Sequence, residues 1–184
     1  MAAPTDLTPG TWTIDAAHSS VAFSVKHLMI SKVRGSFSGF SGTVTVPEDR
    51  LATRVEVTID PSTVNTADAN RDAHLKNGDF FDTEQFPSWN FVSKSIRADG
   101  GDYVLTGDLT MRGVTKPVDL EVEFEGVSKD PWGNVKAGFS AQGEVNRKDF
   151  GMEYNAALET GGVLIGEKVK LSFDIELGKA RVIA

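Results

Sequence analysis

The sequence contains no cysteine, which excludes disulfide bonds, thiolate metal ligands and thiol nucleophiles. It has no run of Lys and Arg, and its net charge of −7 would repel a phosphate backbone, so we exclude nucleic acid as a partner. No apolar stretch approaches the ~20 residues of a membrane-spanning helix, and no basic and apolar leader opens the chain. We therefore expect no integral membrane span and a cytoplasmic location, or a periplasmic or secreted one if a signal was removed.

The motifs of nucleotide and hydrolase chemistry are also missing. There is no Gly-x-Gly-x-x-Gly, no Walker sequence and no Gly-x-Ser-x-Gly. His18 and His27 are expected to lie on one strand and, being an odd number of residues apart, to point to opposite faces. Pairing of His18 with Asp15 is explained better by turn hydrogen bonding than by acid–base chemistry. We expect no catalytic residue, no cofactor and no metal site.

Apolar residues alternate with polar ones along most of the chain, which is the period of strands with one buried face. Long adjacent antiparallel strands of this kind pack against a second sheet or close on themselves, and closure removes the exposed edges. The fold class predicted is all-β, an extended antiparallel barrel of about eight strands. The 184 residues suit a single domain spanning 1–184, in which 1–10 form a flexible tail.

One segment breaks the alternation. Residues 66–78 combine a capping Thr66, early acids, a late Lys76 and a terminal Asn77-Gly78, which predicts one short helix near residues 67–77. His74 falls in its last turn. The aromatics Phe80, Phe81 and Phe86 that follow have no strand pattern, and they could form a gate over one mouth of the barrel or a small satellite core.

The positions expected to face inward are almost wholly apolar. An eight-stranded barrel is just wide enough to be filled by side chains or to hold one small ligand, and periodicity leaves both alternatives open. Any ligand would be mostly hydrocarbon. The candidate ligand-binding residues are Phe23, Val25, Phe37, Val57, Phe80, Phe81, Trp89, Phe91, Leu105, Leu109, Leu120, Phe139 and Phe173.

A series of motifs extends in order along nearly the whole chain: Trp12-Thr-Ile-Asp15, His18-Ser-Ser-Val-Ala-Phe-Ser-Val-Lys-His27, Val33-Arg-Gly-Ser-Phe37, Asp72-Ala-His-Leu-Lys-Asn77, Phe86-Pro87, the segment from Leu105 to Val118, and Val145-Asn-Arg-Lys-Asp-Phe-Gly151. This joint pattern resembles the YceI-like family. The resemblance implies a lipocalin-like barrel that sequesters or carries a long-chain isoprenoid or related lipid, of the polyprenyl, polyprenyl pyrophosphate or quinone type. The alternatives are an enzyme acting on an isoprenoid or quinone precursor and a filled barrel that serves as a protein-interaction module. A homodimer is permitted.

Three basic side chains are candidates for contacting a lipid head group: His18, Arg112 and Arg147. A planar guanidinium suits a pyrophosphate or carboxylate, because it donates two parallel hydrogen bonds. The alternative for Arg112 and Arg147 is plain surface charge, and strand parity places Arg112 on the outside, opposite Met111.

Overall fold

The computed structural model describes residues 6–159 and 162–181, and the first five residues of the expected tail lie outside this range. For residues 6–10 the expected flexible tail is not what the structure has. Gly10 begins the first strand, and Leu7 is only 4% exposed because it packs with Trp12 and Val46 in an apolar cluster at one end of the barrel.

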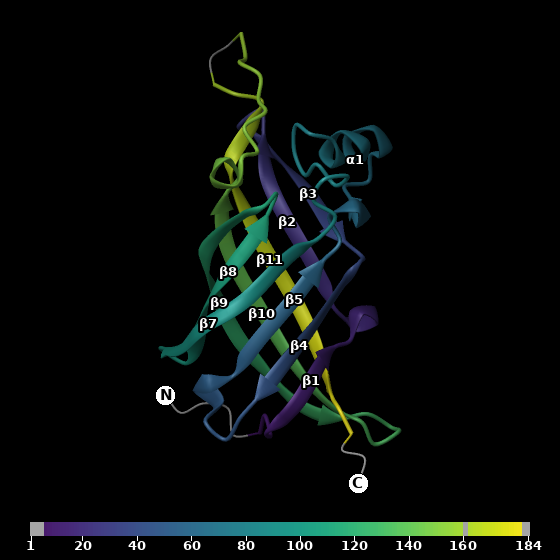
Figure 1. The fold of residues 1–184 in the computed structure, drawn as a ribbon, viewed down its shortest axis with the longest axis vertical. Coiled ribbons are helices and arrows are strands. Elements are labelled where there is room, and N and C mark those ends of the chain that lie inside the picture. The colour runs from purple at the N-terminus through teal and green to yellow at the C-terminus, as the bar shows by residue number, and fades with distance from the viewer. Residues whose placement is uncertain (1–5, 160–161, 182–184) are drawn as a thin grey trace.

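The described residues form eleven strands, one α-helix and four short 3-10 helices (Figure 1). The strands are β1 (Gly10–Ile14), β2 (Ser20–His27), β3 (Ser31–Phe37), β4 (Phe40–Val46), β5 (Arg54–Ile59), β6 (Val64–Asn65), β7 (Trp89–Asp99), β8 (Asp102–Met111), β9 (Val114–Lys129), β10 (Val135–Asn146) and β11 (Ile165–Lys179). The helices are η1 (Ala16–His18), η2 (Arg50–Ala52), η3 (Pro61–Thr63), α1 (Ala69–Lys76) and η4 (Arg147–Phe150).

Eight of the strands close into an antiparallel barrel, as predicted. The order β1-β4-β5-β7-β8-β9-β10-β11 is completed by pairing of β1 with β11, in which Trp12, Thr13 and Ile14 face Lys179, Gly178 and Leu177. The closing seam is therefore short. The earlier part of β11 pairs instead with β2, followed by β3 and β6.

Three strands of the barrel, β1, β4 and β5, are each interrupted and then extended by a further strand toward the end of the molecule that carries α1, which we call the upper end. β1 and β2 follow each other along the same edge of β11, with η1 between them. β3 and β4 are likewise consecutive, as are β5 and β6 on either side of η3. The backbone of Gly39 joins two of the breaks, because its N–H donates to Thr63 Oγ1 at 3.0 Å and its carbonyl accepts from Asp60 at 2.7 Å. The upper end is thus built from strand extensions, with α1 beside them (Figure 1).

Two tight turns join neighbouring strands through left-handed backbone. Arg112 and Gly113, with φ of 52° and 72°, form the hairpin turn between β8 and β9. Leu28 and Met29, with φ of 53° and 61°, occupy the turn between β2 and β3. Glycine, Asn or Asp is favoured at such positions, and each other residue there costs roughly 1–2 kcal/mol.

The helix begins later than the sequence suggested. Asp68 caps it by accepting from the N–H groups of Asn70 and Arg71, so the first helical residue is Ala69. Thr66 has a different role: it is buried, accepts from Arg71 Nε at 2.8 Å and donates to Asp72 Oδ1 at 2.6 Å. Thr66 therefore anchors the helix to the end of β6.

Gly107 in β8 lies where no side chain fits. A Cβ atom there would clash with the Phe91 ring and would lie 2.8 Å from the Val92 carbonyl oxygen, which is backbone and cannot turn away. We expect Gly107→Ala to lower the free energy of unfolding by about 1–3 kcal/mol, measured by urea denaturation. Gly138→Ala is the matched control, since its Cβ would meet nothing closer than 3.4 Å. Equal losses in the two variants would contradict this account.

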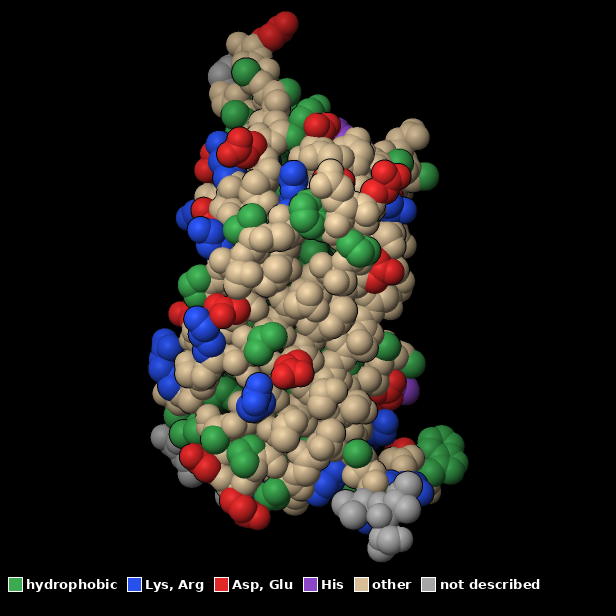
Figure 2. All heavy atoms as spheres, in the orientation of Figure 1, with side chains coloured by type: hydrophobic (Ala, Val, Ile, Leu, Met, Phe, Trp, Pro, Cys, Tyr) green, Lys and Arg blue, Asp and Glu red, His purple; other side chains and the backbone are tan. Residues whose placement is uncertain are grey.

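The outer surface is mixed in charge. Figure 2 shows acidic and basic side chains interspersed over the visible face, with scattered hydrophobic ones between them. Trp132, in the turn between β9 and β10, is 79% exposed. Among the described residues, no helix has the length and apolar character needed to cross a membrane.

Candidate binding cavity

The described residues line at least two cavities inside the barrel, which we call the upper and the lower cavity. The upper cavity has a volume of about 280 Å³ and lies toward α1, with His74 and Leu75 in its wall. The lower cavity has a volume of about 200 Å³ and lies between the strands of the closed barrel. Leu171 of β11 lines both, so the two cavities are neighbours whose walls share this side chain.

All thirteen predicted ligand-binding residues line one of these cavities. The upper cavity is lined by Phe23, Val25, Phe37, Phe80, Phe81 and Trp89. The lower cavity is lined by Val57, Phe91, Leu105, Leu109, Leu120, Phe139 and Phe173. Their location inside the barrel follows from alternation, whereas contact with a ligand stays a prediction.

Trp89 stands out in the upper cavity because its polar atom is unused. The ring packs edge-on against Phe81 and Phe37, with centroids 4.7 and 5.1 Å away. The side chain is 6% exposed, and its Nε1–H has no hydrogen-bond partner among the described residues. Buried donors are nearly always paired, so this N–H lacks the hydrogen-bond acceptor that its burial calls for.

Three rings cover the upper cavity on the side of the helix. His74, Phe80 and Tyr154 contact one another edge-on, with centroids between 4.9 and 5.4 Å apart. Of the expected gate, Phe80 and Phe81 line the upper cavity, whereas Phe86 lines neither cavity and lies against the Gly113 turn. Sequence reasoning missed Tyr154, which no strand or helix pattern marks.

Arg112 is only partly exposed, and its guanidinium contacts the protein itself. Its left-handed backbone turns the side chain across the barrel end, where Nη1 donates to the carbonyls of Phe80 at 2.9 Å and Gly151 at 3.1 Å. It lines neither cavity. Arg112 therefore ties the segment after α1 to the loop after η4.

Arg147 lines the upper cavity but is largely used by the protein itself. It is 4% exposed and donates to the carbonyl oxygens of Met152, Tyr154, Gly166 and Ile165 at 2.6 to 3.3 Å. Burial lowers the pKa of the guanidinium. The expected alternative of surface charge is wrong, because η4 turns this residue inward at the end of β10.

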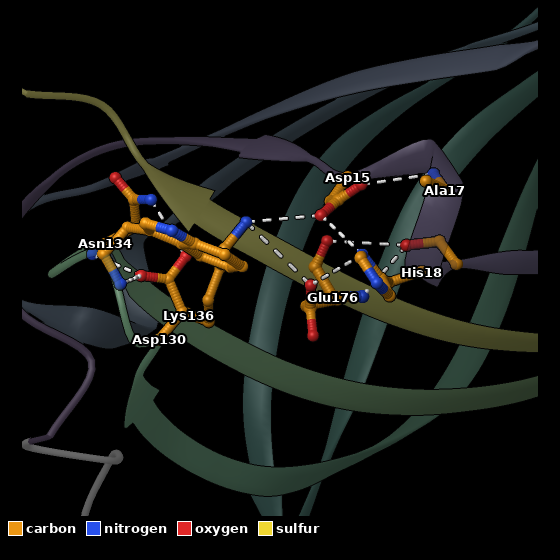
Figure 3. A network of polar contacts seen from close by, with 9 residues as sticks. Asp15, Ala17, His18, Asp130, Asn134, Lys136 and Glu176 are labelled. Carbon is orange, nitrogen blue, oxygen red and sulfur yellow. Dashed lines mark hydrogen bonds and ion pairs between the residues drawn. The ribbon is translucent and has the colours of Figure 1, made fainter.

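His18 lines neither cavity and lies on the seam that closes the barrel (Figure 3). It belongs to η1 rather than to the strand of His27, which corrects the expected arrangement of the two histidines. Its Nδ1 is 2.9 Å from Asp15 Oδ2 and 3.4 Å from Glu176 Oε2. Lys136 Nζ lies 3.2 Å from the same Asp15 oxygen, so the seam carries a network of alternating charge.

The donor atoms of Asp15, His18 and Glu176 all lie within 4.8 Å of one another, a spacing that metal ligands also show. The ammonium of Lys136 contacts both carboxylates, at 3.2 and 3.9 Å, and already supplies the positive charge that they need. Asp15 also caps η1 by accepting from the Ala17 N–H. We assign the cluster a structural role at the seam.

The seam gives stability a pH dependence. The hydrogen bond with His18 lowers the pKa of Asp15 from 3.8 to about 2, and the same bond raises the pKa of His18 above 6.5. Stabilisation by Asp15 is complete above pH 3.8 and is lost as the pH falls toward 2. Stabilisation by His18 is complete below pH 6.5 and is lost as the pH rises through its raised pKa.

We therefore expect the thermal midpoint of wild type to exceed that of His18→Gln between pH 3.8 and 6.5, with the difference vanishing in alkaline solution. Glutamine keeps a donor but does not titrate. Thermal unfolding followed by circular dichroism across this range measures the difference. A difference that stays constant with pH would show that the imidazolium makes no contribution.

Eight antiparallel strands closed around an apolar, two-chambered interior, with a single helix at one end, define an extended barrel of the lipocalin-like class. The model of the YceI-like domain matches residues 12–177. The chain therefore belongs to the YceI-like family, as its motifs indicated.

Known relatives cover almost the whole chain. A UPF0312 protein of Staphylococcus aureus strain MSSA476 is 44% identical over 167 residues, which are 90% of this chain and 95% of that protein. The YceI protein of Campylobacter jejuni is 32% identical, with a TM-score of 0.71 over 91% of this chain and 96% of that one. A polyisoprenoid binding domain from Saccharophagus degradans, 17% identical, shares the fold with a TM-score of 0.69 over 92% of this chain and 98% of that one.

Proposed function

We propose that this protein binds a long-chain isoprenoid lipid inside the barrel and sequesters or carries it. The observation that carries the proposal is the pair of neighbouring apolar cavities that share Leu171 in their walls. One lies toward α1 and the other lies between the strands of the closed barrel, so a single hydrocarbon chain that occupies both is elongated. Each methylene group moved into it from water contributes about 0.8 kcal/mol. Membership of a family whose fold recurs in a polyisoprenoid binding domain supports the same ligand class.

The distribution of polar side chains sets the orientation that we propose for the ligand. Basic and titratable residues gather in the wall of the upper cavity, where Lys26, Arg71 and His74 accompany Arg147. The wall of the lower cavity is apolar apart from Arg50, Thr53 and Tyr103. The head group therefore occupies the upper cavity and the hydrocarbon chain extends past Leu171 into the lower one.

The Nε1–H of Trp89 has no hydrogen-bond partner among the described residues, which favours a head group with an acceptor oxygen, such as a quinone carbonyl or a phosphate ester. Arg147 has few N–H groups left for a ligand, because its guanidinium already donates to four backbone carbonyls. A binding role is preferred over an enzymatic one, because the described residues that line the two cavities are mainly apolar. The open interior also argues against a filled barrel acting only as an interaction module.

The test is mass spectrometry of an organic extract from the protein purified without detergent, with an unrelated barrel prepared identically. We expect a stoichiometric long-chain isoprenoid in the extract of this protein alone. Added polyprenyl lipids or quinones should also quench the fluorescence of wild type in part, and this change should disappear in Trp89→Phe. An empty extract together with no uptake of added lipid would overturn the proposal.

A further inference from the structure

The turn between β2 and β3 is built from residues that its backbone disfavours. Leu28 and Met29 both adopt positive φ, yet neither is Gly, Asn or Asp. Burial does not compensate, because Leu28 is 38%, Met29 is 50% and the following Ile30 is 85% exposed. Strain of this kind persists where the side chains themselves are needed, and here these side chains point at solvent.

The turn shares its end of the molecule with a second apolar segment. The Leu28 N–H donates to the Leu164 carbonyl at 2.9 Å, and Met29 lies beside Gly162. Leu158 and Val163 of the same hairpin are only partly buried. We call Leu28, Met29, Ile30, Leu158 and Val163 the apolar tip. It stands at the end opposite β1 (Figure 1), where hydrophobic side chains lie among charged ones on the surface (Figure 2).

Unpaired cations stand directly behind the apolar tip. Lys26 and Lys32 face each other across the β2–β3 ladder, and Arg34 follows two residues further along β3. All three are exposed, and none forms an ion pair among the described residues. Like charges placed opposite each other destabilise a sheet, so this pair does not serve the fold. The neighbouring hairpin contributes one acid, Glu159.

We propose that the apolar tip docks on the surface of an anionic lipid bilayer. Exposed aliphatic side chains that enter the headgroup region, backed by cations that remain at the phosphate level, are the two components of interfacial membrane binding. The basic cluster is notable on a chain whose net charge is −7, because the rest of the surface would be repelled. The bilayer therefore selects this end of the molecule.

Docking at this end would also place the cavity next to the membrane. Lys26 and His27, which precede the turn, line the upper cavity, as do Leu164 and Ile165 of the adjoining hairpin. A lipid could then pass from the bilayer to the upper cavity along a short path. This consequence rests on the proposed function, whereas docking itself can be measured without any ligand in the barrel.

The test is co-sedimentation with vesicles of phosphatidylcholine alone or mixed with phosphatidylglycerol. We expect wild type to bind the anionic vesicles and to be released by salt. Each cation near such a surface contributes roughly fivefold, so Lys26→Gln/Lys32→Gln/Arg34→Gln should weaken binding roughly a hundredfold. The control Arg97→Gln/Lys116→Gln/Lys129→Gln makes the same change in net charge on other exposed positions, and it should bind nearly as tightly as wild type.

A second variant separates docking from folding. Leu28→Asn/Met29→Gly supplies the residues that the turn backbone favours, so its thermal midpoint should rise by roughly 2–4 °C while vesicle binding falls at least tenfold. Loss of binding cannot then result from unfolding. Trp132→Ser removes an exposed aromatic side chain from the turn between β9 and β10 and should leave binding unchanged.

The proposal is overturned if wild type does not bind anionic vesicles or binds phosphatidylcholine vesicles equally well. It is also overturned if the two triple variants lose binding to the same extent. An isoprenoid in the extract combined with no vesicle binding would reject docking and leave the proposed function intact. Salt-sensitive vesicle binding combined with an empty extract would support docking and reject the proposed function.

Discussion

We expect Arg147→Met to lower the free energy of unfolding by about 3–5 kcal/mol relative to wild type. The guanidinium is 4% exposed and donates to four backbone carbonyls from the loop after η4 and the beginning of β11. Methionine fills much of the same volume but leaves these acceptors without donors. Urea denaturation of the two proteins measures the difference.

Lys148→Met is the control for Arg147. Its ammonium forms an ion pair with Glu167 at 2.9 Å, yet both side chains are nearly half exposed. Exposed pairs of this kind contribute at most about 1 kcal/mol. Arg147→Lys should also be destabilised, because one ammonium group cannot span carbonyls that the planar guanidinium reaches together. A loss below about 1 kcal/mol in Arg147→Met would mean that water replaces the lost donors.

Leu171→Trp weakens binding of a forty-carbon polyprenyl chain by roughly a thousandfold and leaves binding of a fifteen-carbon chain nearly unchanged. Leu171 is common to the walls of the two cavities, so a larger ring there would separate a ligand in the upper cavity from the lower one. Excluding about five methylene groups from the lower cavity removes about 4 kcal/mol. Competition between chains of the two lengths, followed by fluorescence, gives both affinities.

Ser172→Trp is the matched control for this substitution. Ser172 follows Leu171 in β11, is exposed and points to the opposite face of the sheet. The same ring is therefore added outside the barrel, and both chain lengths should bind as they do to wild type. If Leu171→Trp is as stable as wild type in urea and still binds the long chain tightly, the two cavities do not act as one site.

The barrel and its inward face could be predicted from sequence because both depend on one local property, alternation. Phe23, Val57 and Phe173 lie on different strands, yet each is placed inside by the parity of its own strand. Closure then needed only the general rule that open edges are removed. The family motifs confirmed this result and specified the extended form of the barrel.

The polar part of the site could not be predicted in the same way, because it depends on where regular strands end. Parity assigned Arg112 to the outside, but its left-handed backbone redirects the side chain toward Phe80. Arg147 begins a 3-10 helix immediately after β10, which removes it from the alternation altogether. His18 likewise belongs to η1 rather than to a strand. Irregular backbone at these three points carries contacts that no periodic pattern encodes.

The breaks in the strands at η1, Ser38–Gly39 and η3 divide the ladder of backbone hydrogen bonds into two tiers. Amides of the closed ring, such as those of β8, have partners on both sides and exchange with solvent only when the whole domain unfolds. β6 is two residues long and ends the sheet, so its amides exchange by local opening. Under native conditions the closed ring of strands therefore stays rigid, whereas the strand extensions around the upper cavity open locally. Local opening at this end is expected to be faster than unfolding of the ring.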